Sequence, residues 1–138
     1  MSTTNRTPLQ VVQHEVERWA TSYDELRASF RDLLGDEGEY LCQQDMPLLR
    51  GADQALEAIT GFHEGFGVET IEVDWVEIEQ VGNTVWNERV DHMVDAAGER
   101  FLAIPIAGFF RFDDAGTLTA WRDYWDMRKL LALAPEAT

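Results

Sequence analysis

The chain has 138 residues, 45% of them hydrophobic and 11% aromatic, which is long and apolar enough for one globular domain over residues 1–138. It carries 26 acidic against 11 basic residues and a net charge of −15, which disfavours nucleic acid and anionic membrane surfaces as partners. Cys42 is the single cysteine, so no intrachain disulfide forms, and no stretch approaches the roughly 18 apolar residues of a membrane span. We expect a cytoplasmic protein whose acidic surface is mostly solvated.

The first half of the chain shows the spacing of amphipathic helices. Thr7-Pro8 is typical of a helix start, and Ser22 with Glu25 has the spacing of a capping box. Apolar residues at helical spacing then predict one helix from residue 8 to about 20, a second over 23–34 and a third from 52 to about 62. Between the last two, residues 39–46 read as a short strand that Pro47 ends.

The second half alternates with the period of β-strands. The parity of its apolar residues changes near Trp75, which indicates a β-bulge, and Gly82-Asn83 is a hairpin signal. We predict strands over 71–78, 85–94, 100–112 and 117–126, and a short final helix over 127–133. Pro105, Gly108 and the bulge should curl this sheet. The expected fold is α+β, a cone with the helices on the concave side of a strongly curved sheet and one deep pocket.

The strand over 85–94 carries charged residues where a buried strand should be apolar. Asn87, Arg89 and Asp91 share one of its faces because side chains alternate with period 2. The opposite face carries Glu88 and His92, so neither face is cleanly apolar. Alternation alone leaves two interpretations open, a solvated ion pair of little energetic value or a buried pair with a chemical role.

A second charged residue of this kind lies in the last strand. Asp123 shares a face with Trp121 and Trp125, which indicates surroundings of low polarity where a charged carboxylate is disfavoured. If Arg89 contacts both Asp91 and Asp123, it can keep one carboxyl protonated and the other ionised. Such a group would supply a general acid and a general base at fixed separation.

The other reactive residue types show no comparable pattern. His14, His63 and His92 lack the spacing of metal ligands and have no cysteine partners. Cys42 has no histidine near it in the sequence, which favours a buried structural thiol. We therefore expect no metal site.

The two charged segments together resemble a known family. Asn87-Glu88-Arg89-Val90-Asp91, followed later by Trp121-Arg122-Asp123-Tyr124-Trp125-Asp126, is similar to the limonene-1,2-epoxide hydrolase family. That family belongs to the SnoaL-like branch of the nuclear-transport-factor-2-like cone fold. The resemblance covers nearly the whole chain and includes Gln43-Gln44-Asp45-Met46-Pro47 in the middle.

The resemblance implies an Asp–Arg–Asp triad that opens an epoxide in one step, without a covalent ester and without a metal or organic cofactor. Asp91 would protonate the epoxide oxygen, Asp123 would take a proton from the attacking water, and Arg89 would bridge the two. In the family the water is also held by a Tyr and an Asn in the order Tyr-x-Asn, and we expect Gln43 and Asp45 at these positions.

Asp45 would then place a third carboxyl beside Asp123, so that one of the two would take up a proton or the pair would titrate together. The residues expected to line the substrate pocket are Trp121, Trp125, Met93 and Met46.

The leading hypothesis is a cofactor-free epoxide hydrolase that adds water to a small or medium apolar epoxide and gives a vicinal diol. A second is a SnoaL-like polyketide cyclase or an enzyme that opens polyether-type epoxides. A third is a non-catalytic ligand-binding module of the same fold, against which the two carboxylates argue. The resemblance also implies a homodimer formed through the outer face of the sheet.

Overall fold

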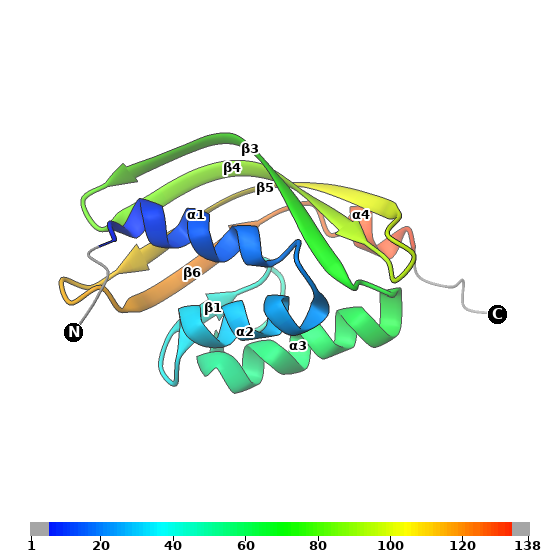
Figure 1. Cartoon of the computed structure of the whole chain (residues 1–138), viewed down its shortest axis with the longest axis horizontal. Coiled ribbons are helices and arrows are strands. Elements are labelled where there is room, and N and C mark those ends of the chain that lie inside the picture. The colour runs from blue at the N-terminus through cyan, green and yellow to red at the C-terminus, as the bar shows by residue number, and fades with distance from the viewer. Residues whose placement is uncertain (1–5, 134–138) are drawn as a thin grey trace.

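The computed structural model describes residues 6–133, and it has one curved sheet with helices on its concave side (Figure 1). The elements are α1 (Pro8–Arg18), α2 (Tyr23–Leu34), β1 (Glu39–Leu41), β2 (Leu49–Arg50), α3 (Gly51–Phe66), β3 (Thr70–Val81), β4 (Thr84–Val94), β5 (Arg100–Phe112), β6 (Leu118–Tyr124) and α4 (Arg128–Leu131). The expected α+β cone is confirmed. None of the helices within residues 6–133 is long and apolar enough to cross a membrane.

The helices begin and end close to where their capping residues predict. The Thr7 hydroxyl accepts the Gln10 N–H while the Gln10 side chain accepts the Thr7 N–H, which completes a capping box on α1. The Ser22 hydroxyl accepts the Glu25 N–H at 3.1 Å and caps α2. Helix α3 continues four residues further than expected and ends at Gly67, whose φ of 79° lies in the left-handed region.

Strands β3 to β6 form an antiparallel meander within a six-stranded sheet of order β2-β1-β6-β5-β4-β3. The register of β3 on β4 shifts between Trp75 and Glu77, so the bulge is confirmed. Strand β1 lies at the other side of the meander and pairs with β6 in parallel, Tyr40 opposite Trp121. This pairing brings residues from near the start and near the end of the chain side by side.

Besides α3, the elements β1 and α4 differ from the prediction, β2 was not predicted, and β3 and β6 have shifted bounds. Strand β1 ends at Leu41 instead of residue 46, because the chain turns there and the Met46 N–H donates to the Gln43 carbonyl. The final helix α4 has only the four residues Arg128–Leu131, and Leu130 is its buried residue.

A cluster of aromatic side chains packs on the concave face around Trp121. Its ring centroid lies 4.4 Å from that of Tyr40, 4.9 Å from those of Phe30 and Phe110, and 5.5 Å from that of Trp19. The cluster joins α2, β1, β5 and β6 to the residue that follows α1. It therefore fixes the position of β6, the strand that carries Asp123, against the helices.

Candidate active site

The odd-numbered face of β4 is the buried one, which decides between the two interpretations of its charged residues. Arg89 is 1% exposed, Asp91 4% and Asn87 8%, whereas Trp86 and Glu88 on the other face are exposed. A charge is expensive to bury unless it is paired and hydrogen-bonded. The partners of Arg89 therefore determine what this face can do.

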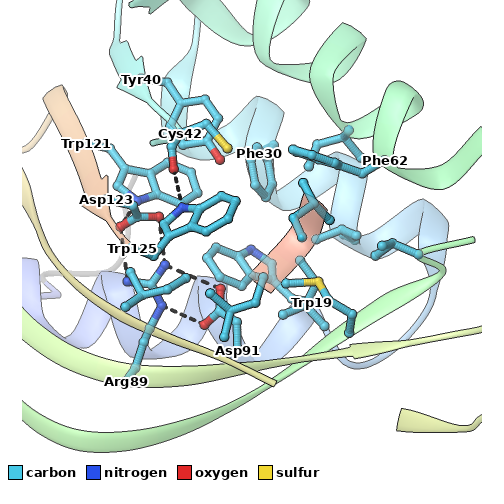
Figure 2. A pocket seen from close by; sticks show the side chains of 18 residues that line it. Trp19, Phe30, Tyr40, Cys42, Phe62, Arg89, Asp91, Trp121, Asp123 and Trp125 are labelled. Atoms are coloured by element: carbon cyan, nitrogen blue, oxygen red, sulfur yellow. Dashed lines mark hydrogen bonds and ion pairs between the residues drawn. The ribbon is translucent and has the colours of Figure 1, made fainter. Parts of the chain in front are cut away.

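All five N–H groups of the Arg89 guanidinium are used, and Figure 2 shows its bonds to the two carboxylates. Nε and Nη2 donate to the two oxygens of Asp91 at 2.8 and 3.5 Å. Nη1 and Nη2 donate to the two oxygens of Asp123 at 3.2 and 2.8 Å. The fifth bond runs from Nη1 to the Asn87 amide oxygen at 2.8 Å. Arg89 thus holds both carboxylates in fixed positions and has no donor left for a ligand.

Gly108 makes the contact between Arg89 and Asp123 possible. Strand β5 lies between β4 and β6, with Gly108 opposite Asn87 on one side and opposite Asp123 on the other. A Cβ at Gly108 would lie 2.2 Å from the Arg122 carbonyl oxygen and 2.7 Å from Asp123 Oδ1. From its sequence position Gly108 was expected only to help curl the sheet. A glycine inside a strand also indicates a close approach of other atoms, which is its role here.

The two indoles beside Asp123 have different roles. Trp121 donates its Nε1–H to Asp123 Oδ1 at 3.2 Å, so it orients the carboxylate that Arg89 holds. Trp125 donates its Nε1–H to the Cys42 carbonyl at 2.7 Å. The expectation that Asp123 lies among aromatic rings is therefore met, with one of the rings bonded directly to it.

The pKa values of Asp91 and Arg89 differ from those of free side chains. Desolvation raises the pKa of Asp91, because it outweighs the attraction of Arg89, and the neighbouring Asp123 adds to the increase. The pKa of Arg89 is also raised, because the attraction of the two carboxylates outweighs its own desolvation. With one proton shared between the two carboxyls, the buried group has no net charge. The geometry therefore suits a site with one acidic and one basic carboxyl.

The triad faces a cavity of about 60 Å³ that eighteen side chains line (Figure 2). Apart from the triad and Cys42, the lining consists of aromatic and aliphatic side chains, among them the expected Trp121, Trp125 and Met93. Met46 is absent from the lining and packs, partly buried, against the core. An apolar cavity with charged groups at one end suits an apolar ligand that carries a single polar reacting group.

Tyr40 of β1 and Cys42 just after it also line the cavity, and the sequence analysis did not select them. Both side chains are buried. Desolvation raises the pKa of Cys42 to about 12 and that of Tyr40 well above its usual value. Both groups are therefore neutral donors at the end of the cavity where Asp123 lies.

Gln43 and Asp45, which we expected to hold a water, lie outside the cavity lining. Gln43 is buried, but its amide donates to the Trp125 carbonyl at 3.0 Å and accepts the Asp45 N–H. Asp45 is exposed, so the expected third carboxyl beside Asp123 is not found there. The reason is the early end of β1: its alternation brings Tyr40 and Cys42 inward, and residues 43–46 turn away.

None of the histidines lines the cavity. His92 binds the exposed Asp74 at 2.9 Å, and His63 contacts the Val68 carbonyl. Across residues 6–133, no group of three or more His, Cys, Asp or Glu side chains is arranged to hold a metal ion.

A family model for the limonene-1,2-epoxide hydrolase catalytic domain matches residues 8–135. The chain belongs to this family. No curated protein sequence matches it. In the structure, Tyr40 and Cys42 line the cavity instead of Gln43 and Asp45, the residues expected at the positions of the family's Tyr and Asn.

Solved structures with the same fold include a limonene-epoxide-hydrolase-like epoxide hydrolase of M. tuberculosis. It is 23% identical, with a TM-score of 0.67, and the match covers 91% of this chain and 86% of that one. A proposed SnoaL-like polyketide cyclase of Shewanella denitrificans is 14% identical, with a TM-score of 0.71 and 91% and 95% covered. A hypothetical protein of Catenulispora acidiphila with a ketosteroid isomerase-like fold, in complex with trimethylamine, is 19% identical, with a TM-score of 0.70 and 94% and 96% covered. These likenesses establish the fold that the limonene-1,2-epoxide hydrolase family shares with other cone proteins.

Proposed function

We propose that this protein is a cofactor-free epoxide hydrolase that adds water to an apolar epoxide and gives a vicinal diol. One observation carries the proposal: two buried carboxylates share one guanidinium whose five N–H groups are all bonded, at the end of an apolar cavity. A purely structural ion pair needs only one carboxylate for one guanidinium. With two carboxyl groups, one can be protonated and act as the general acid while the other is ionised and acts as the general base.

Asp91 is the general acid. Its pKa is raised by burial, so it carries a proton at a higher pH than a solvated aspartate does. It gives this proton to the epoxide oxygen as the C–O bond breaks, and the developing alkoxide leaves as a hydroxyl. Arg89 then balances the Asp91 carboxylate that remains, since two of its N–H groups already bind it.

Asp123 is the general base, and water is the nucleophile. The carboxylate takes a proton from the water while the water oxygen forms its bond to the epoxide carbon. Tyr40 and Cys42 offer hydrogen bonds to that water from the same end of the cavity. After the reaction Asp123 is protonated and Asp91 is ionised. Proton exchange with solvent restores the starting state before the next turnover.

The test is turnover of a panel of simple epoxides in ¹⁸O-labelled water, with diol formation followed by mass spectrometry. We expect one ¹⁸O atom in each diol and turnover of at least one epoxide. Asp91→Asn and Asp123→Asn should each lower kcat by about 10²–10⁴-fold, the usual contribution of a general acid or base. Asp126→Asn is the matched control. Asp126 is an exposed carboxylate just after β6, the strand that carries Asp123, and it pairs with Arg128.

The panel also separates this proposal from its alternatives. Diol formation that is undiminished in either triad variant would refute the assigned roles, and no turnover of any epoxide would refute the activity. A cavity of about 60 Å³ does not favour a polycyclic polyketide substrate, so cyclisation of such a molecule is the weaker alternative.

We also propose that the protein forms a homodimer through the convex face of the sheet, as the family resemblance implies. Trp86 is 47% exposed there, Tyr124 41% and Val76 59%, and the Trp86 ring packs on Phe109. Sedimentation at micromolar concentration should give a dimer, and Trp86→Glu should give a monomer. A monomeric wild-type protein would refute the proposal.

A further inference from the structure

The free space beside the triad is small for an enzyme acting on apolar molecules. Its volume of about 60 Å³ compares with the roughly 150 Å³ cavity that accommodates benzene in a protein core. A ligand that also reaches Asp91 and Asp123 therefore has little room beyond its reacting group. Larger ligands would have to displace side chains that are packed in the core.

The lining shows where the cavity opens. Sixteen of its eighteen side chains are buried, and only Phe62 of α3 and Met93 of β4 are half-buried. Phe62 lies on the opposite side of the cavity from Arg89 (Figure 2). A ligand therefore enters between α3 and the end of β4, with its reacting group directed toward the triad.

One further side chain bounds the cavity from the last helix. Leu130 of α4 lines it and is 7% exposed, whereas Leu131 beside it is 58% exposed. Helix α4 is a single turn with no side-chain cap, and Leu130 is its buried residue. The side of the cavity that α4 forms thus depends on one leucine, in a helix that carries none of the triad residues.

We propose that the substrate is a compact epoxide of about three to four carbon atoms, below benzene in size, and that Leu130 sets this upper limit. The inference rests on the proposed epoxide hydrolysis. It concerns only the size of the substrate, because the Leu130 side chain is a hydrocarbon and takes no part in proton transfer. Shortening Leu130 should admit a larger ring without changing the chemistry.

The experiment compares kcat/KM for propylene oxide, 1,2-epoxybutane, cyclohexene oxide and limonene oxide. For the wild type we expect a preference of about 100-fold or more for the two small epoxides over limonene oxide, since each methylene that does not fit costs about 10- to 200-fold. Leu130→Ala should raise kcat/KM for cyclohexene oxide by about tenfold or more and leave that for propylene oxide unimproved. Leu131→Ala, at the exposed neighbour, should match the wild type.

Leu130→Val, a milder shortening of the same side chain, gives a second test if Leu130→Ala does not fold; it should also favour cyclohexene oxide. Wild-type protein that converts limonene oxide as well as 1,2-epoxybutane would overturn the size limit and leave epoxide hydrolysis standing. The assignment to Leu130 would be overturned if Leu130→Ala folds and gains nothing on cyclohexene oxide, or if Leu131→Ala gains as much. No turnover of any of the four epoxides would overturn the proposed function together with this inference.

Discussion

Replacing Gly108 with alanine should push apart the strands that hold the triad together. The added Cβ would lie 2.2 Å from the Arg122 carbonyl oxygen, and ordinary contact begins at 3.4 Å, so a shift of about 1.2 Å is needed. The obstacle is backbone in the β5–β6 ladder, which cannot rotate away. The φ of Gly108 is not in the left-handed region, so crowding alone is responsible.

Asp123 would move with β6, and its two bonds from Arg89 would lengthen. A misplacement of about 1 Å at a reacting group costs roughly 100-fold in rate, so we expect kcat to fall by about that factor. Overpacking of a well-packed region costs about 1–3 kcal/mol, which should appear as a lower Tm.

The assay is hydrolysis of 1,2-epoxybutane together with thermal unfolding followed by circular dichroism. Gly61→Ala is the matched control, because a Cβ at Gly61 in α3 meets nothing within 4 Å. It should keep the wild-type rate and gain up to about 1 kcal/mol from helix propensity. A Gly108→Ala protein with both wild-type turnover and wild-type Tm would show that the strands do not need this close approach.

Three further predictions concern the buried polar groups. Ionisation of Asp91 lowers the stability of the wild type as the pH rises through the raised pKa of the folded state. The Tm of Asp91→Asn should therefore match that of the wild type at acid pH and exceed it at alkaline pH, while the activity is lost. An equal difference in Tm at all pH values would contradict this. Asn87→Ala leaves one buried N–H of Arg89 without its partner and weakens the hold of Arg89 on Asp91, so kcat should fall by about tenfold. Because Arg89 lowers the pKa of Asp91, the alkaline limb of the pH–rate profile should also move to higher pH. A rate loss with an unmoved limb would mean a purely structural role. Cys42 should resist a thiol reagent at pH 8 and react once per chain after unfolding, because it is 6% exposed and burial raises its pKa to about 12. Rapid reaction of the native protein would refute that burial.

The alternation of β4 and β6 places Arg89 and Asp91 on one face and Asp123 on a face with two indoles, but only the family resemblance implied that these faces meet. Side-chain direction in a strand is a local property, so residues 87–91 and 121–125 could be assigned to faces from the sequence. Which face is buried depends on the packing of distant elements. The structure was needed to decide that for Asn87, Arg89 and Asp91.

The segment after α2 could not be placed in the same way. Its assignment to Gln43 and Asp45 depended on the nearby Met46-Pro47, whereas the residues that enter the cavity depend on the parallel pairing of β1 with β6. That pairing joins parts of the chain about eighty residues apart, and no local pattern reports it. The same holds for Gly108, whose role appears only when β4, β5 and β6 are aligned.

The hydrogen bonds that join residues 42–44 to Trp125 have a consequence for the order in which the protein folds. Cys42, Gln43 and Gln44 bond to Trp125 across sequence separations of 83, 82 and 81 residues. Closing such long loops costs chain entropy, so these contacts form late in folding. A chain still emerging from the ribosome can build α1, α2 and α3, but it has neither β6 nor a cavity. The two buried carboxylates are therefore enclosed only after β6 has been synthesised and has paired with β5 and β1.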